Sequence, residues 1–444
     1  MSEDTVFALS SPVGGAIAIV RITGSGAYAA LGRVFRCKNA PEHRVMNYGH
    51  VIDPESGETI DSAMACFLKA PATYTGEDMA EIYIHGSRVI AKRTLEFLSR
   101  FLRPAEGGEF TKRAFMNGKL DLSQAEAVMD VISSVTEQGA RMAEEQLEGS
   151  IGSGIKDIED RLIDILSGVE AALDYPDELE EDTVSALGSE LAPIIDKLDY
   201  LIRGGNAARI FREGASVAIL GAPNAGKSSL FNALMGTERA IVTSIPGTTR
   251  DTLEETLDIC GAPVRITDTA GIREGADEAE RIGVERAKKA GERADLILIA
   301  IDGTKPIDEE SRALIAAANR GEYRKCLILF TKADKQGFGT DESCAEFAPI
   351  SVSSVTGEGI EELKERMAAL LLTKEAESAL VTNSRHIHAL AEAKAALETA
   401  DAAMGTDLAA ADIRTALYAL GQITGREVTS DVIERIFSRF CVGK

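Results

Sequence analysis

The spacing of apolar residues changes along the 444-residue chain and divides it into four stretches. Over residues 1–117, short apolar runs typical of strands are mixed with helical ones, which predicts a compact α+β domain. Over 118–209 the apolar residues recur at a period of about 3.6, as in a helix, and the same period returns over 376–444. Between them, over 210–375, strand patterns alternate with helix patterns, as in a doubly wound parallel sheet.

These stretches predict a multidomain protein. The two helical stretches flank the α/β stretch, so we expect one α-helical domain into which the α/β domain is inserted, preceded by the α+β domain. The strands expected in the α/β domain are residues 217–220, 256–259, 264–267, 295–301, 327–330 and 349–352. In the first domain the expected strands are 6–9, 16–22, 62–68 and 81–85, and the expected helices lie near 26–34 and 87–101.

A glycine-rich loop follows the first expected strand of the α/β domain. Residues Gly221–Ser228 fit the pattern G-x-x-x-x-G-K-[ST] and lead into a stretch with helical spacing. Glycines let successive backbone N–H groups turn toward one anion, and the new helix presents its positive end to it. We expect Lys227 to reach the β- and γ-phosphates of a nucleotide and the Ser228 hydroxyl to bind Mg²⁺. The expected nucleotide contacts in this loop are Asn224, Ala225, Gly226, Lys227, Ser228 and Ser229.

Four short motifs follow the loop: Gly247–Asp251, Asp268–Gly271, Thr331–Asp334 and Ser353–Val355. Thr249 can offer its hydroxyl and its carbonyl to Mg²⁺ and the γ-phosphate, and Asp268 would hold a magnesium-bound water. The Asp334 carboxylate can accept two parallel hydrogen bonds, which suits guanine and not adenine. Together the motifs predict a P-loop GTPase with a Ras-like doubly wound sheet. The further expected GTP contacts are Thr243, Ser244, Ile245, Pro246, Gly247, Thr248, Thr269, Ala270, Gly271, Thr331, Lys332, Ser353, Ser354 and Val355.

The catalytic glutamine that many GTPases carry after D-T-A-G is missing. Ile272 stands at that position, and an apolar side chain cannot orient the attacking water. We therefore expect catalysis from a cation beside the phosphates or from a carboxylate in the following loop. The candidate acids are Glu274, Asp277, Glu278 and Glu280, for which a purely solvated loop is the alternative interpretation.

Composition limits where the protein works and what it binds. The net charge of −23 argues against a protein that coats nucleic acid, although it excludes neither a local basic site nor a basic partner. The six cysteines form no C-x-x-C pair. No run of about 18 apolar residues occurs, and the amino terminus lacks the basic segment and apolar core of a signal peptide. We therefore expect a soluble, cytoplasmic protein with reduced thiols.

The chain resembles the MnmE (TrmE) family of tRNA-modification GTPases over essentially its whole length. The resemblance rests on the GTPase motifs, on the missing glutamine and on segments outside them: Ile19–Gly24, Tyr74–Asp78, Gly108–Leu122 and Phe440–Lys444. It implies an amino-terminal domain that binds a formylated tetrahydrofolate and forms a homodimer. It also implies a heterotetramer with an FAD-dependent partner, MnmG (GidA), which builds an aminomethyl or carboxymethylaminomethyl group at carbon 5 of the wobble uridine of certain tRNAs.

The resemblance also implies roles for individual residues. By motif position, the folate would be held by Arg21, Glu81, Lys119 and Lys444. A potassium ion, to which the family couples dimerisation of the nucleotide domains, would be held by Asn224, Thr243, Ile245 and Thr248. Glu280 would help to orient water, and Cys441 would be either a catalytic thiol or a structural one.

Two other interpretations stay open from the sequence. One is a regulatory GTPase of the ribosome-assembly type, which takes no part in tRNA chemistry. The other is an adenine nucleotide-binding module. The folate-site residues and Cys441 argue against the first, because a pure switch has no use for a one-carbon carrier, and Asp334 argues against the second.

Overall fold

The computed structural model describes residues 4–237, 256–267, 294–377, 379–401, 405–438 and 440–443. Contacts within the chain group into two compact units. Unit 1 comprises Met1–Met129, Leu147–Ser153 and Gly421–Lys444, and unit 2 comprises Asp130–Gln146 and Gly154–Leu420. The two ends of the chain therefore belong to the same unit.

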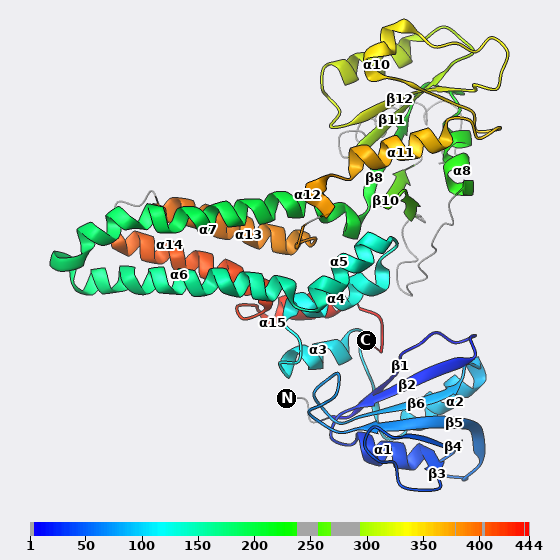
Figure 1. Ribbon diagram of the computed structural model, residues 1–444. Helices are drawn as coiled ribbons and strands as arrows, with labels where there is room; N and C mark the ends of the chain where they lie inside the picture. The colour runs from blue at the N-terminus through cyan, green and yellow to red at the C-terminus, as the bar shows by residue number, and fades with distance from the viewer. Residues whose placement is uncertain are drawn as a thin grey trace. The chain divides into compact units, whose positions relative to one another are not determined.

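Unit 1 is built on a seven-stranded sheet in the order β3-β4-β5-β6-β2-β1-β7 (Figure 1). The strands are β1 (Val6–Leu9), β2 (Ile17–Thr23), β3 (Phe35–Cys37), β4 (Met46–Ile52), β5 (Thr59–Leu68), β6 (Met79–His85) and β7 (Arg103–Pro104). Helices α1 (Ala27–Val34) and α2 (Arg88–Leu98) pack against it and share one apolar core with alternate residues of β2 and β6. The expected strands and both expected helices are present, whereas β3, β4 and β7 are additional.

Strand β4 escaped prediction because glycine and polar residues interrupt its apolar pattern. A Cβ on Gly49 would lie 2.3 Å from the carbonyl oxygen of Arg36 on β3, so the close approach of the two strands requires glycine there. Strand β4 is fixed instead by antiparallel pairing with β5, which begins with Met46 opposite Cys66. Partner strands, and not local spacing, decide this element.

The carboxyl-terminal tail also packs in unit 1. The helices of this region are α3 (Glu109–Met116), α4 (Leu122–Ser133) and α15 (Ser430–Phe437). The rings of Phe437 on α15 and Phe115 on α3 lie in one apolar cluster, which Phe440 extends. Beyond it, Val442 forms an isolated antiparallel bridge with Gly107. The tail therefore lies beside the segment that connects β7 with α3.

Unit 2 contains long helices and the α/β domain. The helices that belong mainly to this unit are α5 (Glu137–Leu147), α6 (Ser150–Asp174), α7 (Pro176–Glu213), α13 (Ser384–Asp401) and α14 (Thr406–Thr424). Helix α13 packs along α7, and Lys394 bonds Asp199 between them at 2.6 Å. Helix α7 and strand β8, the first strand of the α/β domain, are separated by the single residue Gly214, which has φ 75°. Along the described ranges of the chain, no helix is long and apolar enough to cross a membrane.

The α/β domain has a six-stranded sheet in the order β13-β12-β11-β8-β10-β9. The strands are β8 (Ala215–Leu220), β9 (Thr256–Ile259), β10 (Ala262–Thr267), β11 (Leu296–Asp302), β12 (Cys326–Thr331) and β13 (Ile350–Val352). The helices are α8 (Lys227–Thr237), α10 (Glu309–Asn319), α11 (Ile360–Leu371), α12 (Lys374–Glu377) and a 3₁₀ turn, η1 (Glu342–Phe347). Separate apolar cores hold α8 and α11 on one face of the sheet and α10 on the other. The predicted doubly wound domain, inserted between helices of the helical domain, is confirmed (Figure 1).

Candidate functional site

The glycine-rich loop joins β8 to α8 as the sequence pattern predicts. Gly221 has φ 152°, and a Cβ there would lie 2.2 Å from the carbonyl oxygen of Ala300 on β11. Only glycine fits between the two strands at this point. Asn224 at φ 63° and Gly226 at φ 85° then turn the chain into α8. The loop therefore has the tight backbone turn that an anion-binding cradle needs.

The Lys227 side chain folds back across this loop. Its Nζ atom donates hydrogen bonds to the carbonyl oxygens of Gly221 and Ala222 at 2.7 and 2.9 Å. Ser228 and Ser229 follow it in the first turn of α8, and both are exposed. The structure thus gathers an ammonium group, exposed hydroxyls and a helix amino terminus at the carboxyl end of β8, where α/β sheets bind ligands.

Thr331 links the loop after β12 to the glycine-rich loop. It is buried, and its Oγ1 atom lies 2.8 Å from the carbonyl oxygen of Ala225 and 3.1 Å from that of Ile301. A hydroxyl has one proton, so it can donate to these carbonyls in turn or share the proton between them. The threonine makes this connection where asparagine is commoner in GTPases.

The Asp334 carboxylate is oriented by the loop after β13. Its Oδ1 atom accepts a hydrogen bond of 2.6 Å from the Oγ atom of Ser353, which is buried. The Ser353 oxygen in turn accepts from the backbone N–H groups of Val355 and Thr356 at 3.2 and 3.1 Å. The sequence of this loop matches the GTPase pattern only loosely, yet its backbone holds the serine firmly against the carboxylate.

Lys332 contacts the glycine-rich loop and a carboxylate that sequence reasoning missed. Its Nζ atom bonds the carbonyl oxygen of Asn224 at 2.8 Å and Oδ2 of Asp302 at 2.5 Å. Burial by itself would raise the pKa of Asp302, but the hydrogen bonds from Lys332 and Thr304 lower it to about 2. The signal in the sequence was an aspartate at the end of the apolar run of β11. The pairing of β11 with β8, which brings this aspartate close to the glycine-rich loop, is visible only in the structure.

Other predicted residues of the nucleotide site lie outside the described part of the chain. They are Thr243, Ser244, Ile245, Pro246, Gly247, Thr248, Thr249, Asp268, Thr269, Ala270, Gly271 and Glu280. The Mg²⁺ pair of Ser228 with Thr249, the K⁺ ligands other than Asn224, and the water-orienting acid therefore stay predictions. Among the residues that are described, no group of three or more His, Cys, Asp or Glu could hold a metal ion.

The predicted folate residues of unit 1 include a cross-strand ion pair. Arg21 on β2 lies opposite Glu81 on β6, and its Nε atom bonds Oε1 of the glutamate at 2.7 Å. The Tyr83 hydroxyl donates to the other oxygen, Oε2, at 2.5 Å. Burial and this hydrogen bond raise the pKa of Tyr83 to about 12, so it remains a donor at neutral pH. The pair is half-buried and fixed in orientation.

Lys119 contacts a loop that reaches the same region. Its Nζ atom donates to the carbonyl oxygen of Pro71 at 3.2 Å, and its stem packs beside Gly76. The same loop carries Tyr74, whose hydroxyl bonds that of Thr111 at 2.8 Å. Burial raises the pKa of Tyr74, and the positive charge of Arg21 opposes that rise. Tyr74 is therefore close enough to Arg21 for the charge of the arginine to affect it.

The other two predicted residues of this site lie at the carboxyl terminus. Cys441 is half-buried, and its backbone oxygen accepts a hydrogen bond of 3.2 Å from the N–H of Gly108. Lys444 lies outside the described residues. The structure thus places the thiol on the tail beside the start of α3, and the catalytic and structural roles of Cys441 both remain predictions.

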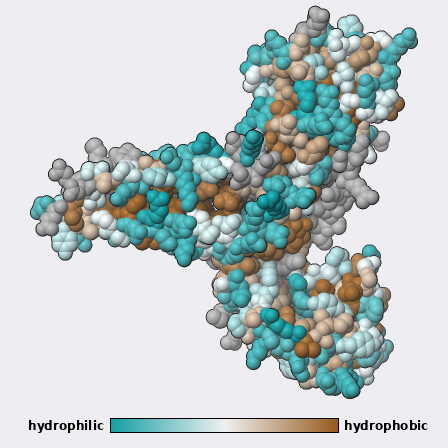
Figure 2. Space-filling model, viewed as in Figure 1, coloured by the Kyte–Doolittle hydropathy of each residue, from teal (hydrophilic) through white to brown (hydrophobic). Residues whose placement is uncertain are grey.

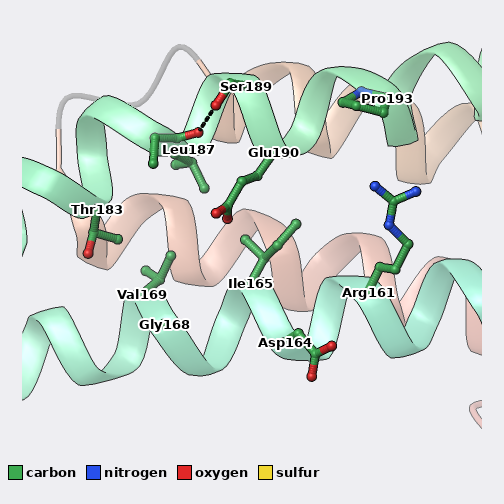
Figure 3. A pocket seen from close by; sticks show the side chains of 11 residues that line it. Arg161, Asp164, Ile165, Gly168, Val169, Thr183, Leu187, Ser189, Glu190 and Pro193 are labelled. Carbon is green, nitrogen blue, oxygen red and sulfur yellow. Dashed lines mark hydrogen bonds between the residues drawn. The ribbon is translucent and has the colours of Figure 1, made fainter.

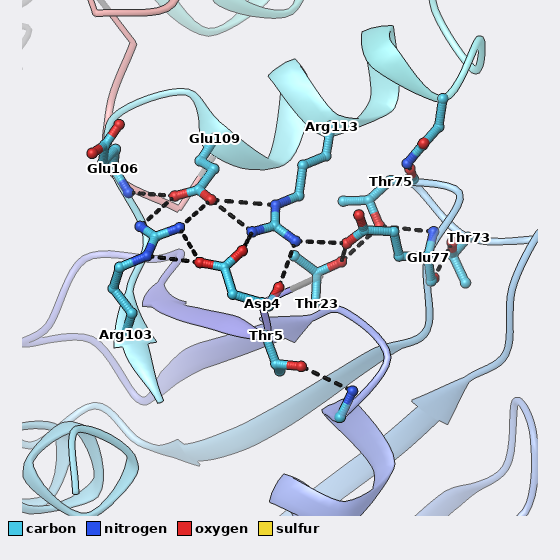
Figure 4. Close-up of polar contacts among 12 residues, drawn as sticks. Asp4, Thr5, Thr23, Thr73, Thr75, Glu77, Arg103, Glu106, Glu109 and Arg113 are labelled. Atoms are coloured by element: carbon cyan, nitrogen blue, oxygen red, sulfur yellow. Dashed lines mark hydrogen bonds and ion pairs between the residues drawn. The ribbon is translucent and has the colours of Figure 1, made fainter. Parts of the chain in front are cut away.

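A network of charges that sequence reasoning missed ties α3 to the loop of Tyr74. Arg113 is 7% exposed and bonds Glu109 at 2.7 Å, Asp4 at 3.0 Å and Glu77 at 3.0 Å (Figure 4). Arg103 bonds the same Asp4 and Glu109, each at 2.8 Å. Glu77 lies in the loop, and Arg113 lies on α3. The network therefore fixes the loop that Lys119 also contacts.

A groove of about 660 Å³ lies between α6 and α7. Figure 3 shows Arg161 and Ile165 of α6 and Glu190 of α7 pointing into the space between the two helices. Its lining mixes apolar and charged side chains and contains none of the residues predicted for the nucleotide or the folate. The groove is therefore not part of either candidate site.

Comparisons with known proteins match both units. A family model described as "MnmE helical domain" matches residues 122–441, and one described as "GTP-binding protein TrmE N-terminus" matches residues 5–119. Two proteins called tRNA modification GTPase MnmE are similar over 100% of this chain. The one from Natranaerobius thermophilus is 38% identical over 100% of its own length, and the one from Acetivibrio thermocellus 41% over 99%. Among solved structures, the G domain of the T. maritima FeoB iron transporter is 32% identical and covers 35% of this chain and 98% of that one, with a TM-score of 0.27.

Proposed function

The chain belongs to the MnmE family of tRNA modification GTPases, and we propose that it hydrolyses GTP to drive modification of carbon 5 of the wobble uridine in certain tRNAs. A tetrahydrofolate derivative would supply the carbon of the aminomethyl or carboxymethylaminomethyl group. An FAD-dependent partner of the MnmG (GidA) type would complete a heterotetramer. The observation that carries the GTP-binding part of the proposal is the joining of the glycine-rich loop to an oriented Asp334 through Thr331 and Lys332. The tRNA-modification part is supported by membership of the MnmE family.

The nucleotide roles follow from the chemistry of these groups. Asp334 would accept the ring N–H and the exocyclic amine of guanine, which adenine cannot offer in that arrangement. Lys227 and the backbone of the glycine-rich loop would bind the phosphates. GTP hydrolysis of this kind uses Mg²⁺, for which the exposed Ser228 hydroxyl is a suitable ligand.

A potassium ion at Asn224 would supply the positive charge that an arginine finger supplies in other GTPases. We expect the steady-state kcat for GTP to be at least about tenfold higher in potassium than in sodium at equal ionic strength. Asn224→Ala should abolish that difference. Asn232→Ala, which changes an exposed residue of α8, should leave it intact. Equal rates in both salts for the unchanged protein would remove potassium from the proposal and leave Glu280 or a partner as the source of catalysis.

The residues of unit 1 fit a tetrahydrofolate in their chemistry. A glutamate with fixed orientation suits the donor edge of a pterin, and cations such as Lys119 suit the carboxylates of the folate tail. Tyr83 and Arg21 occupy both oxygens of Glu81 and so set its direction. One-carbon chemistry would come from the bound folate, while these side chains would hold and orient it.

Arg21→Met tests the folate half of the proposal. Without the arginine, Glu81 loses a charge-assisted bond, so we expect the affinity for 5-formyltetrahydrofolate to fall about tenfold or more, measured by titration calorimetry. Reconstituted with its partner, the variant should give little modified wobble uridine by nucleoside mass spectrometry and keep its GTPase rate. Arg33→Met, in the last turn of α1, should change none of these readouts. Folate binding unchanged by Arg21→Met would contradict the assignment.

An exposed apolar face of unit 1 supports the proposed homodimer. On the strands β2, β4 and β5, the side chains of Ile17, Tyr48, Met46 and Met64 are all exposed, the first two at 60% and 66%. Helices α1 and α2 cover the core residues of the sheet and not these. A face of this kind is typical of an interaction surface, and we assign it to a second copy of the chain.

A further inference from the structure

We propose that Asp302 is a positioning residue for the guanine nucleotide, acting by fixing the side chain of Lys332 across the glycine-rich loop. The inference rests on the proposed function, because it takes the loop of Thr331–Asp334 as the guanine-binding loop. It goes further by giving a role to a residue that belongs to none of the GTPase motifs. The residues involved lie at the ends of the neighbouring strands β8, β11 and β12.

Asp302 ends the strand between the two that carry the nucleotide loops. Strand β11 pairs with β8, which leads into the glycine-rich loop, and with β12, which leads into the loop of Lys332. Asp302 lies directly opposite Thr331 in the register of β11 and β12. A side chain at this position can therefore reach both loops, and the structure shows that Asp302 reaches Lys332.

The Asp302 carboxylate is held by bonds on both oxygens. Oδ1 accepts from the backbone N–H and the hydroxyl of Thr304 at 3.0 and 2.6 Å, and Oδ2 accepts from Lys332 at 2.5 Å. Only 13% of the Asp302 side chain is exposed. Against the opposing effect of burial, hydrogen bonds from Lys332 and Thr304 lower the pKa of this carboxyl to about 2, so it is charged at neutral pH. The two bonds from Thr304 fix the direction in which the carboxylate meets Lys332.

Lys332 needs such an anchor for two reasons. Its backbone has φ 64°, a left-handed conformation that a residue with a Cβ adopts at a cost and keeps only where surrounding contacts enforce it. Its side chain is long and mobile, and it is 24% exposed, so the single bond to the carbonyl oxygen of Asn224 would not hold it alone. The charged bond to Asp302 is the stronger of the two contacts.

The fixed side chain spans the space between the guanine loop and the glycine-rich loop. Its ammonium group lies at Asn224 and its backbone lies two residues before Asp334. The aliphatic stem would therefore contact the guanosine part of the nucleotide, which GDP and GTP share. Substitution of Asp302 should therefore lower the affinities for GDP and GTP by the same factor. Substitution of Lys227 should lower the affinity for GTP more than that for GDP, because Lys227 would bind the phosphates.

Asp302→Asn tests the inference, since it removes the charge and keeps the shape. In equilibrium titrations of the full chain with fluorescent GDP and a fluorescent non-hydrolysable GTP analogue, we expect both dissociation constants to rise about tenfold. At saturating GTP the kcat should stay within about twofold, because the phosphates are held as before. Asp308→Asn should be neutral, because Asp308 caps the amino terminus of α10, where asparagine serves equally well.

The double variant shows whether Asp302 acts through Lys332. Lys332→Met should lower the affinity for both nucleotides, and adding Asp302→Asn to it should cause no further loss of affinity. Thr304→Ala leaves the ion pair in place but removes a bond that orients the Asp302 carboxylate, so the dissociation constants should rise about threefold. This variant gives a second test if Asp302→Asn does not fold. Additive losses, or an affinity unchanged in Asp302→Asn and Thr304→Ala, would overturn the inference. Failure of the unchanged chain to bind GDP would instead overturn the proposed function.

Discussion

Asp334→Asn is expected to raise the dissociation constant for GDP at least about a hundredfold and to create affinity for xanthosine diphosphate. A carboxylate accepts both donors on the guanine edge, whereas an amide accepts one and turns its own N–H donors toward the other. Xanthine carries an oxygen where guanine carries the amine, so the amide matches it. Ser353 should then support the new side chain through the same hydroxyl, because an amide oxygen can also accept its hydrogen bond.

Competition titrations with GDP, ADP and xanthosine diphosphate measure this change. Ser353→Ala should lower the affinity for GDP by a smaller factor, about tenfold, because the carboxylate remains but loses the bond that orients it. Asp308→Asn is the matched control for the same chemical change at a helix cap of the same domain. If Asp334→Asn left the affinity for GDP unchanged, the residue that recognises guanine would have to lie elsewhere in the chain.

Arg113→Met is expected to lower the free energy of unfolding of unit 1 by about 3–5 kcal/mol. The arginine is 7% exposed and stands between Glu109, Glu77 and Asp4, so its loss leaves three carboxylates close together without their central cation (Figure 4). Arg103→Met is the matched control. Arg103 contacts two of the same carboxylates but is 44% exposed, and such pairs contribute only about 1 kcal/mol or less.

Urea titrations followed by circular dichroism at two or more wavelengths measure both variants. The loop of Tyr74 should also become more accessible to protease in Arg113→Met, because Glu77 anchors it. Equal stability of the two variants would mean that the buried network is replaceable by apolar packing.

The same network predicts how stability depends on pH. Burial would raise the pKa of Glu109, but hydrogen bonds from Arg103 and Arg113 lower it from its ordinary 4.5 to about 2. A carboxyl group whose pKa is lower in the folded state stabilises the fold above its unfolded pKa, and that contribution is lost as pH falls through the folded value. Unit 1 should therefore lose stability between about pH 4.5 and pH 2, and the slope there should be smaller in Arg113→Met.

The doubly wound domain could be predicted from the sequence because its signals are local. Each expected strand is a short apolar run. The glycine-rich loop lies between the strand β8 and the helix α8, and all three fall within residues 215–237. The helical period on both sides of it indicated the insertion. In unit 1 the same reasoning found β1, β2, β5 and β6, and it failed at β4, where Gly49 breaks the pattern and pairing with β5 decides the structure.

The sequence by itself determined the elements, their order and the residue types of the loops, since these depend on neighbours in the chain. The tertiary structure alone decided which charged and hydroxyl groups meet. Asp302 and Lys332 are 30 positions apart, Ala225 and Thr331 are 106 apart, and Asp4 and Arg113 are 109 apart. Apolar spacing reports which face of an element is buried and not which strand lies next to it. The order of the strands in the sheet determines which side chains lie close enough to bond. Burial then makes such bonds necessary, because a charged group or hydroxyl removed from water needs a hydrogen-bonding partner.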